Sequence, residues 1–538
     1  MLSAALPFRP MDPVSRRLFL KATLTSGVGL ALPSSPFAGQ APAIVTSDRI
    51  RPLTPSGIQI GDPAADRAVI WSRTDRPARL VVDRSFRSDF GGAVRVRGPM
   101  ALDTSDYTAR LDLTHLPPDR DIFVRVMFED LSAGRQVLSA PVEGRFRTAP
   151  TGRRNISFLW SGDTAGQGFG INPDWGGMKT YETMRRLHPD FFVHCGDTIY
   201  ADGPISSSMT LDDGSVWRNI VTEEVSKVAE TLKDFRGRYA YNLLDEHVRR
   251  FSAEVPQVWQ WDDHEVLNNW SDSKDLSQDP RYTERNIRVL AGRAAQAFRE
   301  YAPVRFERPG GADRIYRKLA YGPLLDLFML DERSYRGPNS YNRQPQQGRD
   351  TAFLGVAQLE WLKQELSQSK ALWKVVSSDM PIGLIVSDGR DAEGRQVYEA
   401  VANGDGTVLG REFEFAELFR FIKQHRIRNV VWITADVHYT AAHYYDPTRS
   451  RFQDFDPFWE FVSGPLHAGS FGPNALDNTF GPTVMFQKAP ATPNAPPSSG
   501  FQFFGQMDLD ASNGDLTVTL KDLAGASLYV KRLEPLRA

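Results

Sequence analysis

The chain has 538 residues, which is too long for one typical domain and long enough to bury a large core. Its 64 basic and 66 acidic side chains leave a formal charge of -2, which argues against a nucleic-acid binder, because such proteins normally carry a basic excess or a basic face. The single cysteine, Cys195, excludes an intramolecular disulfide and a thiolate cluster.

Residues 1–45 have the pattern of an export segment. Arg16 and Arg17 precede Phe-Leu-Lys, then a mildly apolar stretch and a group of small residues. The pattern resembles a twin-arginine signal, which implies the twin-arginine export machinery as a partner and a periplasmic or secreted location. A disordered basic amino terminus is the alternative. No other stretch approaches the ~20 apolar residues of a membrane span, so we expect no span in the mature protein.

Residues 46–150 are predicted to form an all-β domain. Short runs of alternating apolar and polar residues are separated by turn residues, a pattern typical of an antiparallel immunoglobulin- or fibronectin-like β-sandwich. The runs are residues 67–73, 78–84, 106–113, 121–130 and 142–148. None of them combines His, Asp and Glu, so we do not expect catalysis in this domain.

Residues 151–538 alternate between strand and helix patterns and are predicted to form an α/β domain. A helix over residues 179–190 lies between two apolar strands, and this β-α-β order predicts parallel pairing. Further helices are expected within 223–251, where the charges suggest exposed helices, and over 283–302, 355–369 and 414–428. The carboxyl-terminal part is β-rich, with strands expected over 501–510 and 515–523.

Four strand-like runs of this domain end in side chains that bind metals. They end at Asp163, at Asp197, at Asp263 with His264, and at Asp436 with His438. In an open α/β sheet, ligands bind in the crevice beyond the carboxyl ends of the strands. Two metal ions ~3.5–4 Å apart can neutralise a phosphoryl group and need a shared carboxylate between them. Asp197, central in the series and set in a Gly-Asp turn, is the best candidate for that bridge.

The series resembles the calcineurin-like metallophosphoesterase superfamily and, more closely, the PhoD-type alkaline phosphatases. The resemblance rests on the motifs GDTIYA, WDDHE followed by NNW, ADVH, LDERSYR and the helix GVAQLEWL. It covers nearly the whole chain, including the export segment and the amino-terminal sandwich. It implies a four-layer metallophosphoesterase β-sandwich flanked by helices in residues 151–538.

The resemblance also implies a set of metal ligands. It places Fe³⁺ on Asp197, Tyr200 and His438, and Ca²⁺ on the other side of Asp197. Calcium takes oxygen ligands, for which the candidates are Asp263, Asp436 and either Asn268 or Asn269. Asp163 stands where well-studied members have a cysteine, and the loss of a thiolate weakens the case for iron over other metals.

Three residues are candidates for catalysis. His264 occupies the position of a superfamily histidine that contacts the phosphate or the leaving group, which implies a proton donor or charge stabiliser. Arg333 or Arg336 could bind two phosphate oxygens; a surface ion pair with Asp331 or Glu332 is the alternative. Asp379 is a further candidate ligand or substrate contact, whereas Cys195 is expected in the core.

The resemblance implies an exported, metal-dependent alkaline phosphatase that hydrolyses phosphate monoesters, and diesters as well, through attack of a metal-bound hydroxide or alkoxide. Two other functions stay open. The first is a phosphodiesterase or phospholipase D-like hydrolase on the same scaffold. The second, of another class, is a non-catalytic exported phosphate-binding protein.

Overall fold

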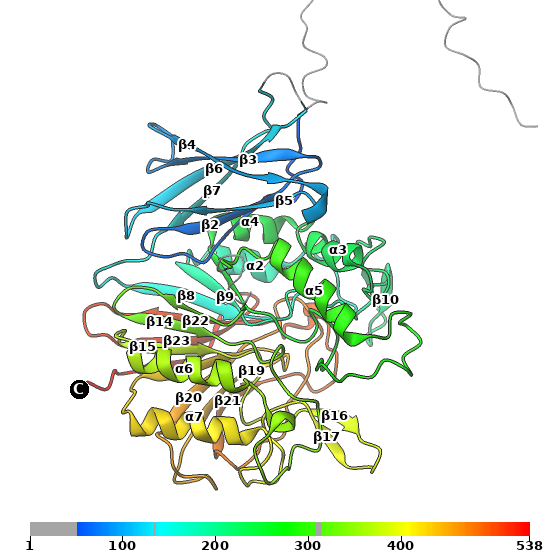
Figure 1. The fold of residues 1–538 in the computed structure, drawn as a ribbon, viewed down its shortest axis with the longest axis vertical. Coiled ribbons are helices and arrows are strands. Elements are labelled where there is room, and N and C mark those ends of the chain that lie inside the picture. Colours follow the sequence, from blue (N-terminus) through cyan, green and yellow to red (C-terminus); the bar gives the residue numbers. More distant parts are fainter. Residues whose placement is uncertain (1–50, 133–135, 307–313, 538) are drawn as a thin grey trace, which may run out of the picture. The chain divides into compact units, whose positions relative to one another are not determined.

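The computed structural model describes residues 51–132, 136–306 and 314–537 (Figure 1). The expected export segment, residues 1–45, lies outside the described residues. Among the helices of the described ranges, none is long and apolar enough to cross a membrane.

The first strands form an all-β domain, as predicted. One sheet has the order β4-β3-β6-β7, and β1, β2 and β5 lie in the other. Ile122, Val124 and Val126 alternate along β6 and are buried in the core between these sheets. The bounds are β1 (Ile58–Gly61), β2 (Ala68–Arg73), β3 (Ala78–Ser85), β4 (Val94–Ala101), β5 (Thr108–Leu113), β6 (Asp121–Asp130) and β7 (Val142–Arg147).

The strand β1 also joins this domain to the rest of the chain. It pairs in parallel with β12 (Gln257–Trp259), with Gly61 opposite Gln257. A Cβ at Gly61 would lie 1.9 Å from the carbonyl oxygen of Pro303, so only glycine fits this close approach. The strands β1, β2 and β5 therefore extend the first sheet of the larger domain, a continuity that the sequence did not indicate.

The larger domain contains two facing sheets. The nine-stranded sheet has the order β24-β23-β22-β8-β9-β12-β1-β2-β5, and the seven-stranded sheet has the order β13-β14-β15-β18-β20-β19-β21. Phe158 and Val193 of the first sheet and Leu327 and Val431 of the second belong to one buried cluster between them. The bounds are β8 (Ile156–Ser161), β9 (Phe191–His194), β13 (Arg317–Ala320), β14 (Leu325–Met329), β15 (Trp373–Ser377), β18 (Val430–Thr434), β19 (Thr440–Tyr445), β20 (Phe458–Val462), β21 (Pro482–Lys488), β22 (Phe503–Leu509), β23 (Leu516–Asp522) and β24 (Ser527–Leu533).

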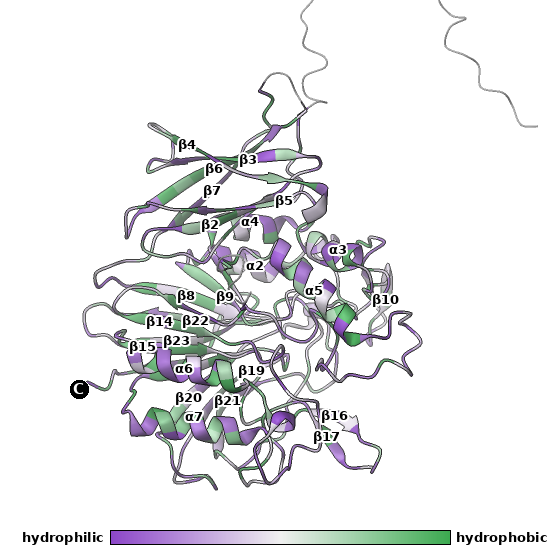
Figure 2. Ribbon diagram, viewed as in Figure 1, coloured by the Kyte–Doolittle hydropathy of each residue, from purple (hydrophilic) through white to green (hydrophobic). Residues whose placement is uncertain are grey.

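Helices cover the outer faces of both sheets and complete the four layers. On the first sheet, α2 (Lys179–Arg185), α3 (Leu232–Asn242), α4 (Glu246–Glu254) and α5 (Ile287–Tyr301) share a buried cluster with Leu159 and Phe192. On the second, α6 (Val356–Gln368) and α7 (Glu412–Gln424) share another with Val376 and Trp432. The two colours mixed along α6 and α7 in Figure 2 reflect one apolar and one polar face. Two short hairpins, β10 (Ser208–Thr210) with β11 (Val216–Arg218) and β16 (Ser387–Arg390) with β17 (Gln396–Tyr398), lie outside the main sheets.

The stretch 223–251 differs from its prediction. The helix α3 begins only after Thr231, whose hydroxyl accepts a hydrogen bond from the Asp234 backbone while the Asp234 carboxylate accepts one from the Thr231 backbone. This capping box fixes the start of the helix, so residues 223–230 are not helical. The prediction that helices of this stretch cover the sheet is confirmed, because Phe235, Tyr239 and Phe251 are buried in one cluster with residues of the first sheet.

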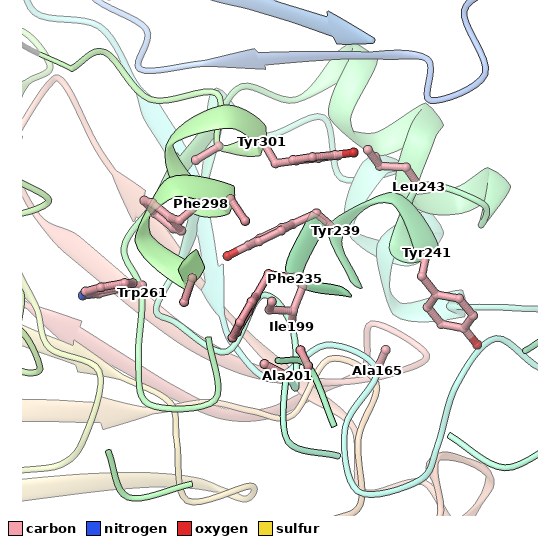
Figure 3. Packing of buried hydrophobic residues seen from close by; sticks show 14 of the residues in the cluster. Ala165, Ile199, Ala201, Phe235, Tyr239, Tyr241, Leu243, Trp261, Phe298 and Tyr301 are labelled. Carbon is pink, nitrogen blue, oxygen red and sulfur yellow. The ribbon is translucent and has the colours of Figure 1, made fainter. Parts of the chain in front are cut away.

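The topology brings the carboxyl ends of several parallel strands together. In the first sheet β8, β9 and β12 pair in parallel, and in the second β14, β15, β18 and β20 do so. The loop after β9 is anchored in the helical layer, where Ile199 and Ala201 belong to the same buried cluster as Phe235 of α3 (Figure 3). Loops that leave one edge of two facing sheets can then carry polar side chains to a common point.

Candidate metal centre and active site

Four of the residues expected to bind metal follow these strands in left-handed backbone conformations. The φ angles are 68° at Asp163, 52° at Asp197, 63° at Asp436 and 59° at His438. Non-glycine residues rarely adopt this region, and they cluster there at sites where the surrounding structure holds a functional side chain in place. Gly196 precedes Asp197 with φ 108°, and a Cβ there would lie 2.4 Å from Cβ of Asp262. The loops after β9 and β12 can therefore approach only with glycine at this position.

The structure brings six of the candidate residues, with Asp262, into three groups. Within each group the ligand atoms lie within 4.8 Å of one another. Asp197 belongs to two of the groups, and Asp263 also belongs to two. The groups are Asp163 with Asp197 and His438, Asp197 with Asp263 and His264, and Asp262 with Asp263 and Asp436.

Several carboxylate oxygens of these groups lack a protein hydrogen-bond donor. Both side-chain oxygens of Asp163 and Oδ1 of Asp263 are buried without a hydrogen-bond partner. Burial and the neighbouring carboxylates raise the pKa of Asp197 well above its usual value. Buried acidic groups without donors are costly unless a cation neutralises them. The donor set of carboxylate, imidazole and phenol groups therefore fits metal ions that prefer oxygen and nitrogen ligands.

His438 is oriented as a metal-binding histidine. Its Nδ1 contacts the carbonyl oxygen of Gly469, and its Nε2 lies 2.7 Å from the hydroxyl oxygen of Tyr200. A ring N–H donated to a backbone carbonyl leaves the other nitrogen as a lone-pair donor, which is the usual arrangement of a histidine ligand. Burial lowers the pKa of His438 to about 4, so the neutral ring is favoured. Burial and Asp197 raise the pKa of Tyr200, so a phenolate here requires a cation beside it.

His264 is held by a carboxylate that the sequence analysis did not single out. Its Nδ1 lies 2.6 Å from Oδ1 of Asp202, and its backbone N–H donates to Oδ1 of Asp197 at 3.2 Å. Burial lowers the pKa of His264, but Asp202 and Asp263 more than offset this and raise it to about 10. The carboxylates around His264 therefore favour its protonated form. Asp202 lies two residues after Tyr200, in the same loop. This position is the only feature of the sequence that could have pointed to a role for Asp202 in the site.

The two asparagines have different surroundings. The backbone N–H of Asn269 donates to Oδ2 of Asp263, and its side-chain amide donates to Asp388 at 2.8 Å. Asn268 is exposed, and its backbone N–H donates to Asp202 at 3.0 Å. Of the two, Asn269 is therefore the one in direct contact with a member of the carboxylate groups.

Arg333 is buried among carboxylates. Its Nε donates to Asp262 at 2.5 Å and to Asp379 at 2.9 Å, and another nitrogen contacts Glu399. Its Nη2 also lies 3.7 Å from Oδ1 of Asp436. Because the side chain is fully buried, the alternative of a surface ion pair is wrong.

Arg336 lies farther from the three carboxylate groups than Arg333 does. It donates to the side-chain oxygen of Asn339 at 3.0 Å and to the backbone oxygen of Glu399. Its Nη1 lies 4.0 Å from Oε1 of Glu399, and its guanidinium lies over the ring of Phe353. The structure therefore does not bring Arg336 to the three carboxylate groups. Glu399 joins both arginines, and no sequence motif pointed to it.

Glu265 holds the loops after β9 and β12 together through hydrogen bonds. Its carboxylate accepts hydrogen bonds from the backbone N–H groups of Asp197 at 3.2 Å, Thr198 at 2.7 Å and Asp262 at 2.8 Å, and from the Thr198 hydroxyl at 2.6 Å. It thus joins the loop after β9 to the loop after β12. Cys195 is buried in the core between the sheets, as expected.

Comparisons with known proteins identify the family of the chain. A family described as PhoD-like phosphatase matches residues 158–520, and one described as PhoD-like phosphatase, N-terminal domain, matches residues 39–150. The chain belongs to the PhoD-like phosphatase family. The resemblance inferred from the sequence motifs is thereby confirmed, and membership places the chain in a family of phosphoric ester hydrolases.

Two relatives illustrate the similarity. Alkaline phosphatase D of Bacillus subtilis (strain 168) is 27% identical over 405 residues, which are 71% of this chain but only 64% of the relative. A solved structure described as "Structure of PhoD" superposes with a TM-score of 0.67 at 20% identity and covers 92% of this chain and 94% of the other. This second match shows the fold, and it confirms the predicted four-layer domain preceded by a small all-β domain.

Proposed function

We propose that this PhoD-like phosphatase hydrolyses phosphate esters, monoesters and diesters alike, in a site built on two metal ions that share Asp197. The observation that carries the proposal is the membership of Asp197 in two neighbouring groups of ligand atoms. A shared carboxylate is what two close cations need to offset their repulsion. Bound there, the metal ions would supply positive charge for the phosphoryl oxygens and lower the pKa of a water molecule.

The ligand sets differ in chemistry. We assign Asp163, Tyr200 and His438 to one side of Asp197, and Asp263, Asn269 and Asp436 to the other. The first set contains a phenol and an imidazole and suits a trivalent ion such as Fe³⁺, whereas the second contains only oxygen donors and suits Ca²⁺. Asn268 drops out of the proposed set because it is exposed and Asn269 contacts Asp263.

His264 is the proposed proton donor to the leaving oxygen. The Asp202 carboxylate on Nδ1 holds the ring and favours its protonated form, so Nε2 can carry the proton that the leaving alkoxide needs. Arg333 holds Asp262 and Asp379 beside the ligands and acts through them rather than on the phosphate. Arg336, in the Glu399 network, is proposed to act only through Arg333.

The function can be tested with two substrates and an elemental analysis. We expect protein purified without added metal to contain iron and calcium and to hydrolyse both p-nitrophenyl phosphate and its bis ester. Hydrolysis of the bis ester alone would favour a phosphodiesterase. Metal-loaded protein that binds phosphate but hydrolyses neither ester would overturn the enzymatic proposal.

We also propose export by the twin-arginine route, on the basis of Arg16 and Arg17 in residues 1–45. Replacing both arginines with lysine should leave the phosphatase in the cytoplasmic fraction of a host with this export system. The unchanged chain should appear in the periplasm or the medium. Equal export of the two forms would contradict the assignment.

A further inference from the structure

A residue of the β16–β17 hairpin, Asp388, contacts Asn269 beside the candidate site. Asp388 is half-buried, with 17% of its side chain exposed, whereas Ser387, Gly389 and Arg390 of the same strand are exposed. The residue lies far in the sequence from the metal-binding motifs, and no motif drew attention to it.

Three donors from two separate loops converge on this carboxylate. The side-chain amides of Asn269 and Asn339 each donate to it at 2.8 Å, and Nζ of Lys274 lies 3.2 Å away. Asn269 and Lys274 follow β12, and Asn339 follows β14. The amide of Asn339 also donates to the backbone oxygen of Asn269 at 3.0 Å. Asp388 is thus the common acceptor of the two loops beside the site.

The contact with Asn269 has a chemical consequence. An amide that donates through its nitrogen to Asp388 has its carbonyl oxygen on the opposite branch, directed away from that carboxylate. The backbone N–H of the same residue donates to Asp263, which fixes the residue against two of the three carboxylate groups. The left-handed φ of 56° at Asn269 turns the chain sharply at this point.

We propose that Asp388 is a positioning residue, which orients the amide oxygen of Asn269 toward the oxygen-rich metal set and holds the hairpin against that side of the site. The proposal rests on the proposed function for the identity of that set. Residues that orient a metal ligand in this way typically change metal affinity by about 10- to 100-fold when removed.

The chain offers a matched control on the same hairpin. Asp391 has the same side chain and a similar exposed fraction, 20%, but it binds Arg395 within the hairpin at 2.7 Å. Asp391→Asn therefore perturbs the hairpin without touching Asn269. A second comparison is Asp388→Asn, because its amide oxygen can still accept from Asn269 but no longer balances the charge of Lys274.

The test measures calcium binding to metal-depleted protein by titration calorimetry, with thermal unfolding as a check on the fold. We expect Asp388→Ala to weaken calcium binding about 10- to 100-fold, Asp388→Asn to weaken it less, and Asp391→Asn to leave it within twofold. In the double variant with Asn269→Ala, removing Asp388 should add almost nothing, because both changes affect one ligand.

Calcium affinity of Asp388→Ala equal to the control, fully additive effects in the double variant, or a wild-type chain that binds no calcium would each overturn the proposal. The calorimetric result does not depend on turnover. A wild-type chain that binds calcium but hydrolyses no ester would remove the proposed function and leave the role of Asp388 standing.

Discussion

Two buried carboxylates beside Asp197 have opposite surroundings. Asp163 shares a ligand group with Asp197, and neither of its oxygens has a hydrogen-bond partner. Glu265 receives four hydrogen bonds, three of them from backbone N–H groups that include that of Asp197. The protein satisfies the carboxylate that supports the loops and leaves the one that faces the site without donors. This difference indicates which carboxylates a cation must complete and which ones the fold completes itself.

The largest effect is expected at Asp197, which shares a ligand group with Asp163 and donates its backbone N–H to Glu265. Asp197→Asn removes the negative charge shared by two ligand groups, so both ions should be lost. Loss of several kcal/mol of charge stabilisation corresponds to a fall in activity on the order of 10³-fold or more. Elemental analysis and ester hydrolysis of the purified variant check this. Retained activity with retained metal would show that Asp197 is not the bridge.

His264→Ala should separate catalysis from metal binding. The ring is proposed to donate a proton, and its backbone N–H, which contacts Asp197, is unchanged by the substitution. We expect turnover to fall about 10²- to 10³-fold while the metal content stays the same. The loss should be smaller for an ester whose leaving group needs no proton, such as p-nitrophenyl phosphate, than for an alkyl ester. Equal losses on both esters would argue against proton donation.

The contrast between Asp163 and Glu265 can be tested directly in metal-depleted protein. Glu265→Gln places an amide NH₂ against backbone donors, which should cost about 2–4 kcal/mol of unfolding free energy. Asp163→Asn removes a buried charge without donors and should leave the metal-free protein as stable as the wild type, or more so. Chemical denaturation of both variants measures the difference. Equal destabilisation by the two substitutions would mean that the two carboxylates are not distinguished as described.

Much of this arrangement could be predicted from local sequence. The strands that precede Asp163, Asp197 and Asp436 are mainly apolar runs, and the topology of parallel strands carries their ends to one edge. The parallel pairing of β8 and β9 followed from the helix pattern between them. Residues that bind a ligand directly after a strand can therefore be predicted from a single sequence.

The parts that were missed depend on long-range contacts. The strand pairing that joins the two domains matches Gly61 with Gln257, which lie almost two hundred residues apart in the sequence. The proposed choice of Asn269 over Asn268 depends on a left-handed turn at Asn269, where the backbone contacts Asp263. Asp388 reaches the site only because its hairpin is folded back over loops from two distant strands. Periodicity contains no information of this kind.

A third buried carboxylate, Glu412, has more hydrogen bonds than Asp163 and fewer than Glu265. Its substitution is expected to have the smallest effect. Glu412, at the start of α7, accepts hydrogen bonds from the amide of Asn403 at 2.8 Å and the backbone of Leu409 at 3.2 Å, but its Oε1 has no partner. Burial and the nearby Asp477 raise the pKa of Glu412 to about 9. Because its pKa is raised and only one of its two carboxylate oxygens accepts hydrogen bonds, this side chain is expected to be neutral at pH 7.

The sign of the pH dependence follows from this shift. Because the folded pKa lies above the unfolded one, the folded state retains a proton that the unfolded state loses, and stability falls as the pH rises toward 9. The contribution amounts to about 1 kcal/mol between pH 7 and pH 8. Glu412→Gln should abolish this part of the pH dependence. The unfolding free energy of the variant should therefore rise relative to that of the wild type as the pH increases. Denaturation of metal-depleted protein at pH 7 and pH 8 measures it, and parallel curves for the two proteins would show that Glu412 is ionised in the folded state.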